Sequence, residues 1–96
     1  MHTYNPEISA RYILQNHPKG RLWNDDFGWP KFPEDWNEWK PWSKSEKLLY
    51  FIGLNLWNGY ADPKYTKLDP SYIIETLDEN QVSFLEESMR KGMISL

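Results

Sequence analysis

The sequence contains no cysteine among its 96 residues, and it has few glycines. Without cysteine the chain can form no disulfide bridge, no thiolate zinc site and no thiol nucleophile, so its fold must rest on packing. Each glycine is isolated, which excludes a glycine-rich phosphate-binding loop. The glycines are Gly20, Gly28, Gly53, Gly59 and Gly92.

A long apolar run is also missing. The longest, from Leu48 to Trp57, has ten residues and includes Gly53 and Asn55, whereas a membrane-spanning helix needs about 20 apolar residues. The N-terminal sequence has neither the basic region nor the apolar segment of a signal peptide. We therefore expect a soluble, cytoplasmic protein with no membrane partner.

Neither half of the chain carries an excess of charge. The sequence has 11 basic and 14 acidic residues, a net charge of -3. Residues 1–42 contain 5 basic and 6 acidic side chains, and residues 43–96 contain 6 and 8. Nucleic-acid binding depends on clustered Lys and Arg that neutralise phosphates, so we predict that the protein does not bind nucleic acid.

Side chains for catalysis are scarce. The two histidines are His2, in a terminal segment that we expect to be frayed, and His17, at the expected end of a helix. Asp25 and Asp26 follow Asn24, but the residues after them do not fit a calcium-binding loop, and an Asx-type turn is the better interpretation. We predict a protein that is not an enzyme and that uses no metal ion and no cofactor.

Start signals predict four helices. Asn5-Pro6-Glu7 begins the first helix, which ends before His17. Two capping boxes, at residues 43–46 and 78–81, and an Asp-Pro pair at residues 69–70 begin the others. These helices are expected from Lys44 to about Trp57, from Pro70 to about Leu77, and from Glu79 to about Lys91, with Gly92 as the last C-cap.

The helix over residues 44–57 is apolar all round, so other elements must surround it. Prolines make residues 18–42 irregular apart from a short helical turn from about Glu34 to Lys40, which places Trp36 and Trp39 on one face. The expected fold is a single all-α domain over residues 1–96. It is a compact bundle of about four helices, with the Trp/Pro-rich segment packed on the central helix.

Five of the six tryptophans lie between Trp23 and Trp42. Their rings could cover the central helix, bind a protein partner, or form a platform for sugar rings beside carboxylates. We expect a mixture in which one or two rings are exposed. The candidate binding residues are Trp23, Trp29, Trp36, Trp39, Trp42, Asp25 and Asp26.

Three short motifs carry a resemblance to a known group of proteins. They are Trp42-Ser43-Lys44-Ser45-Glu46-Lys47-Leu48, Asn55-Leu56-Trp57-Asn58-Gly59, and Leu77-Asp78-Glu79-Asn80. Residues 42–91 thereby resemble small uncharacterised proteins of Gram-positive phages and mobile elements, although the last Asn comes one place early. The resemblance implies a compact helical protein in a phage or mobile-element setting, and it implies no catalytic residues.

The function we expect is a non-enzymatic protein-interaction module, in this setting a modulator of a host protein. The excess of aromatic residues and the scarcity of catalytic side chains favour it. The alternatives are a carbohydrate-binding protein with a Trp platform and a homo-oligomeric structural subunit.

Overall fold

A computed structural model of the chain describes residues 2–32, 41–58 and 70–95. This part is mostly helical, as predicted, but it also contains short strands that the sequence did not predict, so the fold is not purely α. The elements in chain order are β1 (His2–Tyr4), α1 (Pro6–Gln15), β2 (Trp23–Asn24), β3 (Trp29–Pro30), α2 (Lys44–Asn58), α3 (Pro70–Thr76), α4 (Glu79–Lys91) and β4 (Met93–Ser95). The helical turn predicted over residues 34–40 lies outside the described residues.

Local hydrogen bonds at the starts of α1, α2 and α4 explain why these three helices begin where they were expected. The Ser43 amide donates to the Glu46 carboxylate at 2.8 Å, and the Glu46 amide donates to the Ser43 hydroxyl at 3.2 Å. Asp78 and Gln81 form the same reciprocal box before α4, and the Asn5 side chain caps α1. Each box satisfies amides that the first helical turn leaves without partners.

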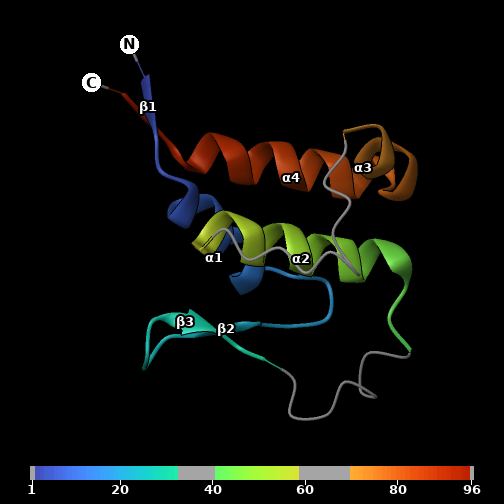
Figure 1. Cartoon of the computed structure of the whole chain (residues 1–96), viewed down its shortest axis with the longest axis horizontal. Helices are drawn as coiled ribbons and strands as arrows, with labels where there is room; N and C mark the ends of the chain where they lie inside the picture. Colours follow the sequence, from blue (N-terminus) through green and yellow to red (C-terminus); the bar gives the residue numbers. More distant parts are fainter. Residues whose placement is uncertain (1, 33–40, 59–69, 96) are drawn as a thin grey trace.

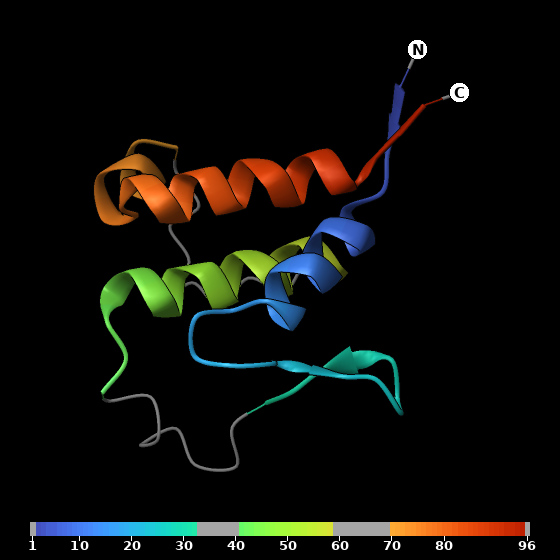
Figure 2. The same ribbon diagram turned by 180° about the vertical axis from the view of Figure 1, so that it is seen from behind.

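The helices surround α2, as its sequence predicted. Helices α1 and α2 lie side by side in the middle of the molecule, α3 and α4 lie on one side of them, and the β2–β3 hairpin lies on the other (Figures 1 and 2). Helix α2 contributes buried side chains to both sides. These are Leu48, Leu49, Tyr50, Phe51, Ile52 and Leu54.

Two clusters of buried side chains form the core. One joins Leu14 of α1 and Trp23 of the hairpin to the α2 residues Tyr50, Phe51 and Leu54. The other contains Ile13, Leu48, Leu49, Ile52 and Leu77, and partly buried side chains of α3 and α4 pack against it. Helix α2 therefore lies between two layers, with the hairpin closing one and the C-terminal helices closing the other.

Gly53 allows α1 and α2 to pack closely. A Cβ atom at this position would lie 3.0 Å from Cγ and Cδ2 of Leu14 and 3.3 Å from Cγ2 of Ile13. Both neighbours are fully buried. The glycine thus removes the atoms that would hold the two helices apart.

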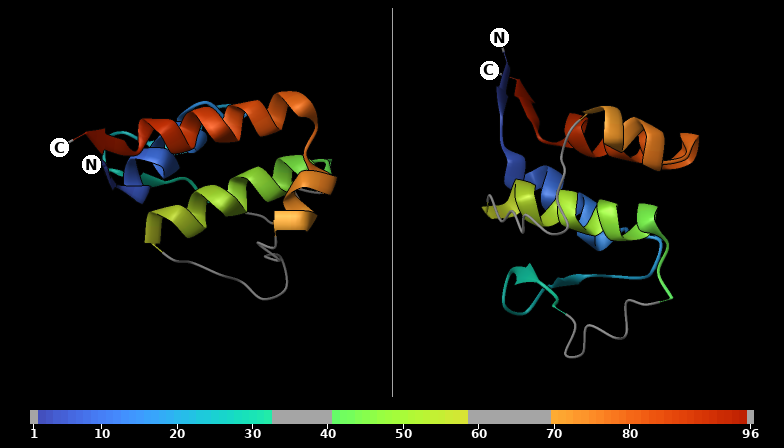
Figure 3. Two further views of the ribbon diagram at one scale, coloured as in Figure 1. Left: turned by 90° about the horizontal axis from the view of Figure 1, so that it is seen from above. Right: turned by 45° about the vertical axis from the view of Figure 1, so that its right-hand side comes forward.

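The chain ends pair with each other, which corrects the expectation of a frayed N-terminal segment. Strand β1 is antiparallel to β4, with Thr3 opposite Ile94, and the two strands lie side by side away from the helices (Figure 3). Each of these strands has three residues, which is too short for a local sequence pattern to predict it. The strands pair because α1 and α4 bring the two ends of the chain together. Gly92 is the C-cap, as predicted, but in a right-handed conformation. A Cβ there would lie 2.5 Å from Oγ of Ser9 and 2.7 Å from the Asn5 carbonyl oxygen.

Candidate functional site

The β2–β3 hairpin carries most of the predicted binding residues that the structure describes. Its turn is of the predicted Asx type, because the Asn24 side-chain oxygen accepts hydrogen bonds from the amides of Asp26 at 3.1 Å and Phe27 at 3.4 Å. Gly28 closes the turn with a φ of 71°, a left-handed conformation that favours glycine. The turn therefore has a defined shape.

The register of the hairpin decides which rings face the helices. Trp23 lies opposite Pro30, and Asn24 lies opposite Trp29. Because neighbouring side chains on a strand point to opposite faces, Trp23 and Pro30 share one face and Trp29 belongs to the other. Accordingly, Trp23 is 2% exposed and Pro30 is fully buried, whereas Trp29 is 50% exposed.

Two of the predicted binding tryptophans have structural roles. Trp23 belongs to the core cluster of Leu14 and Phe51, and the guanidinium of Arg11 lies 5.2 Å from its ring centroid. Trp42 is half-buried and packs against the same cluster. These rings cover the central helix, as the structural interpretation of the tryptophans expects.

Among the described residues, the three most exposed aromatic side chains, Phe27, Phe32 and Trp29, lie on the hairpin or directly after it. Phe27 is 67% exposed and Phe32 is 52% exposed. The rings of Phe27 and Trp29 stack with centroids 5.4 Å apart and planes 16° apart; we call this pair the aromatic stack. Phe27 was not among the predicted site residues. Its place in the predicted turn did indicate exposure, because turns lie at the surface.

Charged residues lie near the aromatic stack in the sequence of the hairpin segment. The guanidinium of Arg21 holds Asp25 by two hydrogen bonds, from Nε to Oδ2 at 2.8 Å and from Nη2 to Oδ1 at 2.7 Å. These bonds lower the pKa of the Asp25 carboxyl below its ordinary value. No described residue forms an ion pair with Asp26 or Lys31. A depression of about 300 Å³ lies among these side chains, lined by Arg21, Trp23, Asn24, Asp25, Asp26 and Lys31.

The predicted residues Trp36 and Trp39 lie outside the described residues. Of the others, the structure brings Trp29, Asp25 and Asp26 together on the hairpin, and it turns Trp23 and Trp42 towards the helices. The exposed site therefore consists of the aromatic stack and the charged side chains of Arg21, Asp25, Asp26 and Lys31.

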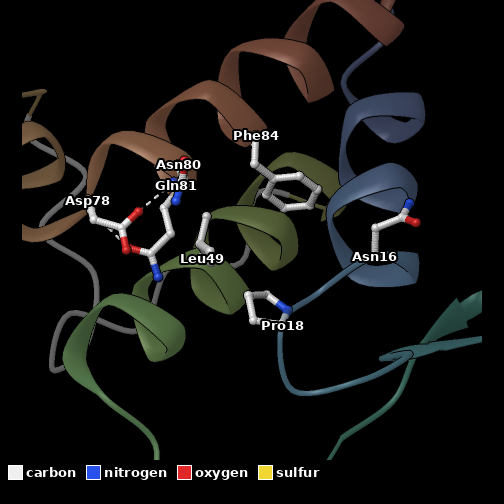
Figure 4. A pocket seen from close by; sticks show the side chains of 7 residues that line it. All are labelled: Asn16, Pro18, Leu49, Asp78, Asn80, Gln81 and Phe84. Carbon is white, nitrogen blue, oxygen red and sulfur yellow. Dashed lines mark hydrogen bonds between the residues drawn. The ribbon is translucent and has the colours of Figure 1, made fainter.

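A second depression of about 330 Å³ lies where the end of α1 meets α2 and the start of α4. Figure 4 shows the side chains that line it: Asn16, Pro18, Leu49, Asp78, Asn80, Gln81 and Phe84. Several of its polar groups already have partners, because Asp78 and Gln81 bond each other and Asn16 donates to the Tyr12 carbonyl oxygen. It thus offers apolar surface with few free polar groups to orient a ligand.

Within residues 2–32, 41–58 and 70–95, no three or more His, Asp or Glu side chains form a group that could hold a metal ion. No helix in the described part of the chain is long and apolar enough to cross a membrane.

Comparison of the chain with protein-family models, curated proteins and solved structures finds no significant match.

Proposed function

We propose that the protein is a non-enzymatic interaction module that binds a partner protein through the aromatic stack of Phe27 and Trp29. The observation that carries the proposal is that both rings remain at least half exposed while the opposite face of the same hairpin is buried. Exposed aromatic patches are uncommon on surfaces without a partner, and Trp is enriched among residues that dominate binding energy.

The hairpin is suited to present the stack because its inner face is held by the core. Trp23 packs among buried side chains of α1 and α2, and the Tyr50 hydroxyl donates to the Lys31 carbonyl oxygen at 2.6 Å. The Lys31 amide in turn donates to the Leu22 carbonyl oxygen at 2.8 Å. A surface that is already ordered loses little conformational entropy on binding.

The shape of the hairpin favours a concave partner. The turn lies at the side of the molecule remote from α4 (Figures 1 and 2). Pro30 has no amide hydrogen and so weakens β3 as an edge for strand addition. We expect the rings to insert into an apolar cleft of the partner, with Asp26 and Lys31 meeting polar groups at its rim.

The resemblance of residues 42–91 supports a biological setting for this proposal. In that setting the partner would be a host protein of a Gram-positive bacterium and the module a modulator of it, acting in the cytoplasm.

Carbohydrate binding is the second candidate, favoured by the presence of Trp29, Asp25 and Asp26 on one hairpin. It has weaker support because the stack occupies one face of each ring and leaves a single face of Trp29 for a sugar ring. Self-association through the stack is the third candidate.

The experiment compares three immobilised proteins: the wild type, the double variant Phe27→Ala/Trp29→Ala, and the control Ile74→Ala. Ile74 is 62% exposed on α3, away from the hairpin. A bacterial protein retained by the wild type and the control, but not by the double variant, supports the proposal. For the purified complex we expect binding about 30-fold weaker or more in the double variant, because central aromatic residues contribute about 2 kcal/mol or more.

Equal retention by all three proteins contradicts the proposal. A glycan that shifts the tryptophan fluorescence of the wild type but not of the double variant would favour sugar binding. Light scattering that shows a dimer of the wild type and a monomer of the double variant would favour self-association.

A further inference from the structure

His17 is a buried histidine outside the proposed binding surface. It follows α1 and is 4% exposed. Its Nε2 lies 2.8 Å from the carbonyl oxygen of Glu46, and its Nδ1 accepts a hydrogen bond from the Lys19 amide at 3.1 Å. The carbonyl oxygen can only accept and the amide can only donate, so the ring is neutral with its hydrogen on Nε2.

The ring joins three parts of the chain. It begins the loop of residues 17–22, it bonds the first turn of α2 through Glu46, and it stacks on Trp42 with ring centroids 5.0 Å apart and planes 26° apart. Trp42 also meets Tyr50 of the core edge-on, at 6.3 Å. The imidazole therefore holds the loop and Trp42 on the start of the central helix, together with the Lys19–Glu46 ion pair and the contact of Trp42 with Tyr50.

The charged groups facing His17 are Lys19 in its own loop and Glu46 on α2. Their side chains form an ion pair, with Lys19 Nζ 3.5 Å from Glu46 Oε2. Burial lowers the pKa of His17 below its ordinary value of 6.5, outweighing the hydrogen bond to the Glu46 carbonyl and the attraction of the Glu46 charge, which raise it.

We propose that His17 is a pH-sensitive latch. Its neutral ring holds the loop of residues 17–22 and Trp42 on the start of α2, and its protonation opens this corner of the fold. Protonation adds a hydrogen to Nδ1. The Lys19 amide then faces a second donor instead of an acceptor, and their hydrogen bond is lost. It also leaves a charge in a buried position, which opening to water relieves.

The opening is local because other contacts hold the neighbouring elements. The Leu22 amide donates to the Leu14 carbonyl oxygen at 2.6 Å, and Trp23 stays in the core cluster. Helices α1, α2 and α4 pack through contacts that do not involve His17. Acidification therefore exposes Trp42 and frees the Lys19 amide before it unfolds the protein.

The direction of the pH effect follows from the lowered pKa. The unfolded chain takes up a proton at His17 near pH 6.5, and the folded chain does so at a lower pH. The stability that the neutral ring contributes is therefore complete above pH 6.5 and is lost as the pH falls through the folded pKa.

The test is an NMR titration of the full chain between pH 7.5 and pH 4.5 in a His2→Gln background, so that His17 is the only histidine that titrates. We expect the Nε2-protonated tautomer at neutral pH and a transition below pH 6.5 that shifts the Trp42 indole signal. The exchange rate of the Lys19 amide, divided by its intrinsic rate, should rise severalfold as the pH falls from 7 to 5, in step with the titration of His17.

The matched control is His17→Gln, which has a donor and an acceptor like the neutral ring but does not titrate. In this variant the Trp42 signal and the corrected Lys19 exchange should not change over the same pH range. The latch is refuted if the wild-type ring titrates at or above pH 6.5 or if its titration leaves the Trp42 signal unmoved. If the variant does not fold, the pH at which His17 titrates and the Trp42 signal of the wild type still test the latch.

Discussion

The α1 side of helix α2 and the side covered by the β2–β3 hairpin bury large residues in different ways. Against α1, the contact is complete: Ile13 and Leu14 are fully buried, and Gly53 brings the two backbones together. Against the hairpin, β2 supplies one buried ring, Trp23, whereas β3 leaves Trp29 exposed. A helix pair can direct a wide stripe of side chains inwards, whereas a hairpin must expose every second residue.

This difference suggests a division of roles. The helical part stabilises the fold, and the hairpin leaves the rings of Phe27 and Trp29 exposed to solvent.

The largest expected difference lies within the hairpin. Trp23→Ala should destabilise the protein by about 3–5 kcal/mol because it empties a filled position in the core. Trp29→Ala should cost less than about 1 kcal/mol, since it removes an exposed ring and one stacking contact. Urea unfolding followed by circular dichroism measures both, and equal losses for the two variants would contradict the assignment of the faces.

The junction of α4 with the chain ends should tolerate little change. Gly92→Ala is expected to cost about 1–3 kcal/mol because its Cβ would meet Ser9 and the backbone oxygen of Asn5. Adding Ser9→Gly should restore part of the loss and not all of it, because the Asn5 carbonyl remains. Thermal unfolding of the single and double variants measures the effect, and a neutral Gly92→Ala would mean that the ends are looser than the structure indicates.

The stability that the capping box contributes at the start of α2 should decrease in acid. Hydrogen bonds from Ser43, above all from its amide, lower the pKa of Glu46 below its ordinary value of 4.5. The stability from this carboxylate is therefore present above pH 4.5 and is lost as the pH falls through the folded pKa. Glu46→Gln keeps an acceptor for the Ser43 amide, so it should cost about 0.5–1 kcal/mol at pH 7 and reduce the loss between pH 5 and pH 3.

The matched control for that experiment is Glu79→Gln, an exposed residue in the first turn of α4. Urea unfolding at pH 7, 5 and 3 should show the wild-type loss in this control. An unchanged acid response in Glu46→Gln would show that other groups cause it.

The smallest change in stability is expected from the Arg21–Asp25 ion pair on the hairpin segment. Arg21→Gln breaks the ion pair with Asp25, which is exposed to solvent and open to screening. We expect a small decrease in Tm at low salt that disappears in 0.5 M NaCl (on the order of a 4 Å Debye length). A decrease that persists in high salt would mean that this pair also holds the shape of the hairpin.

The helices could be predicted from the sequence because their signals are local. Two capping boxes and an Asn-Pro-Glu start place the beginnings of α1, α2 and α4. The strands could not be predicted, because each has two or three residues and is defined by its partner. For β1 the partner lies at the other end of the chain, beyond the reach of any local pattern.

The candidate site was predictable in part. The concentration of aromatic residues located the region, and Asn24-Asp25-Asp26 indicated the turn that carries it. The predicted site residues were tryptophans and carboxylates, so the exposure of Phe27 was not predicted, although the turn itself places this residue at the surface.

The sequence by itself determined that no disulfide forms, where the helices begin, and that α2 must be covered on all sides. Those properties follow from composition, from hydrogen bonds between near neighbours and from helical periodicity. The tertiary structure alone decided which tryptophans are buried. Trp23 and Trp29 are the same residue type in the same segment, and they differ because the hairpin register turns one ring towards α2 and the other towards solvent.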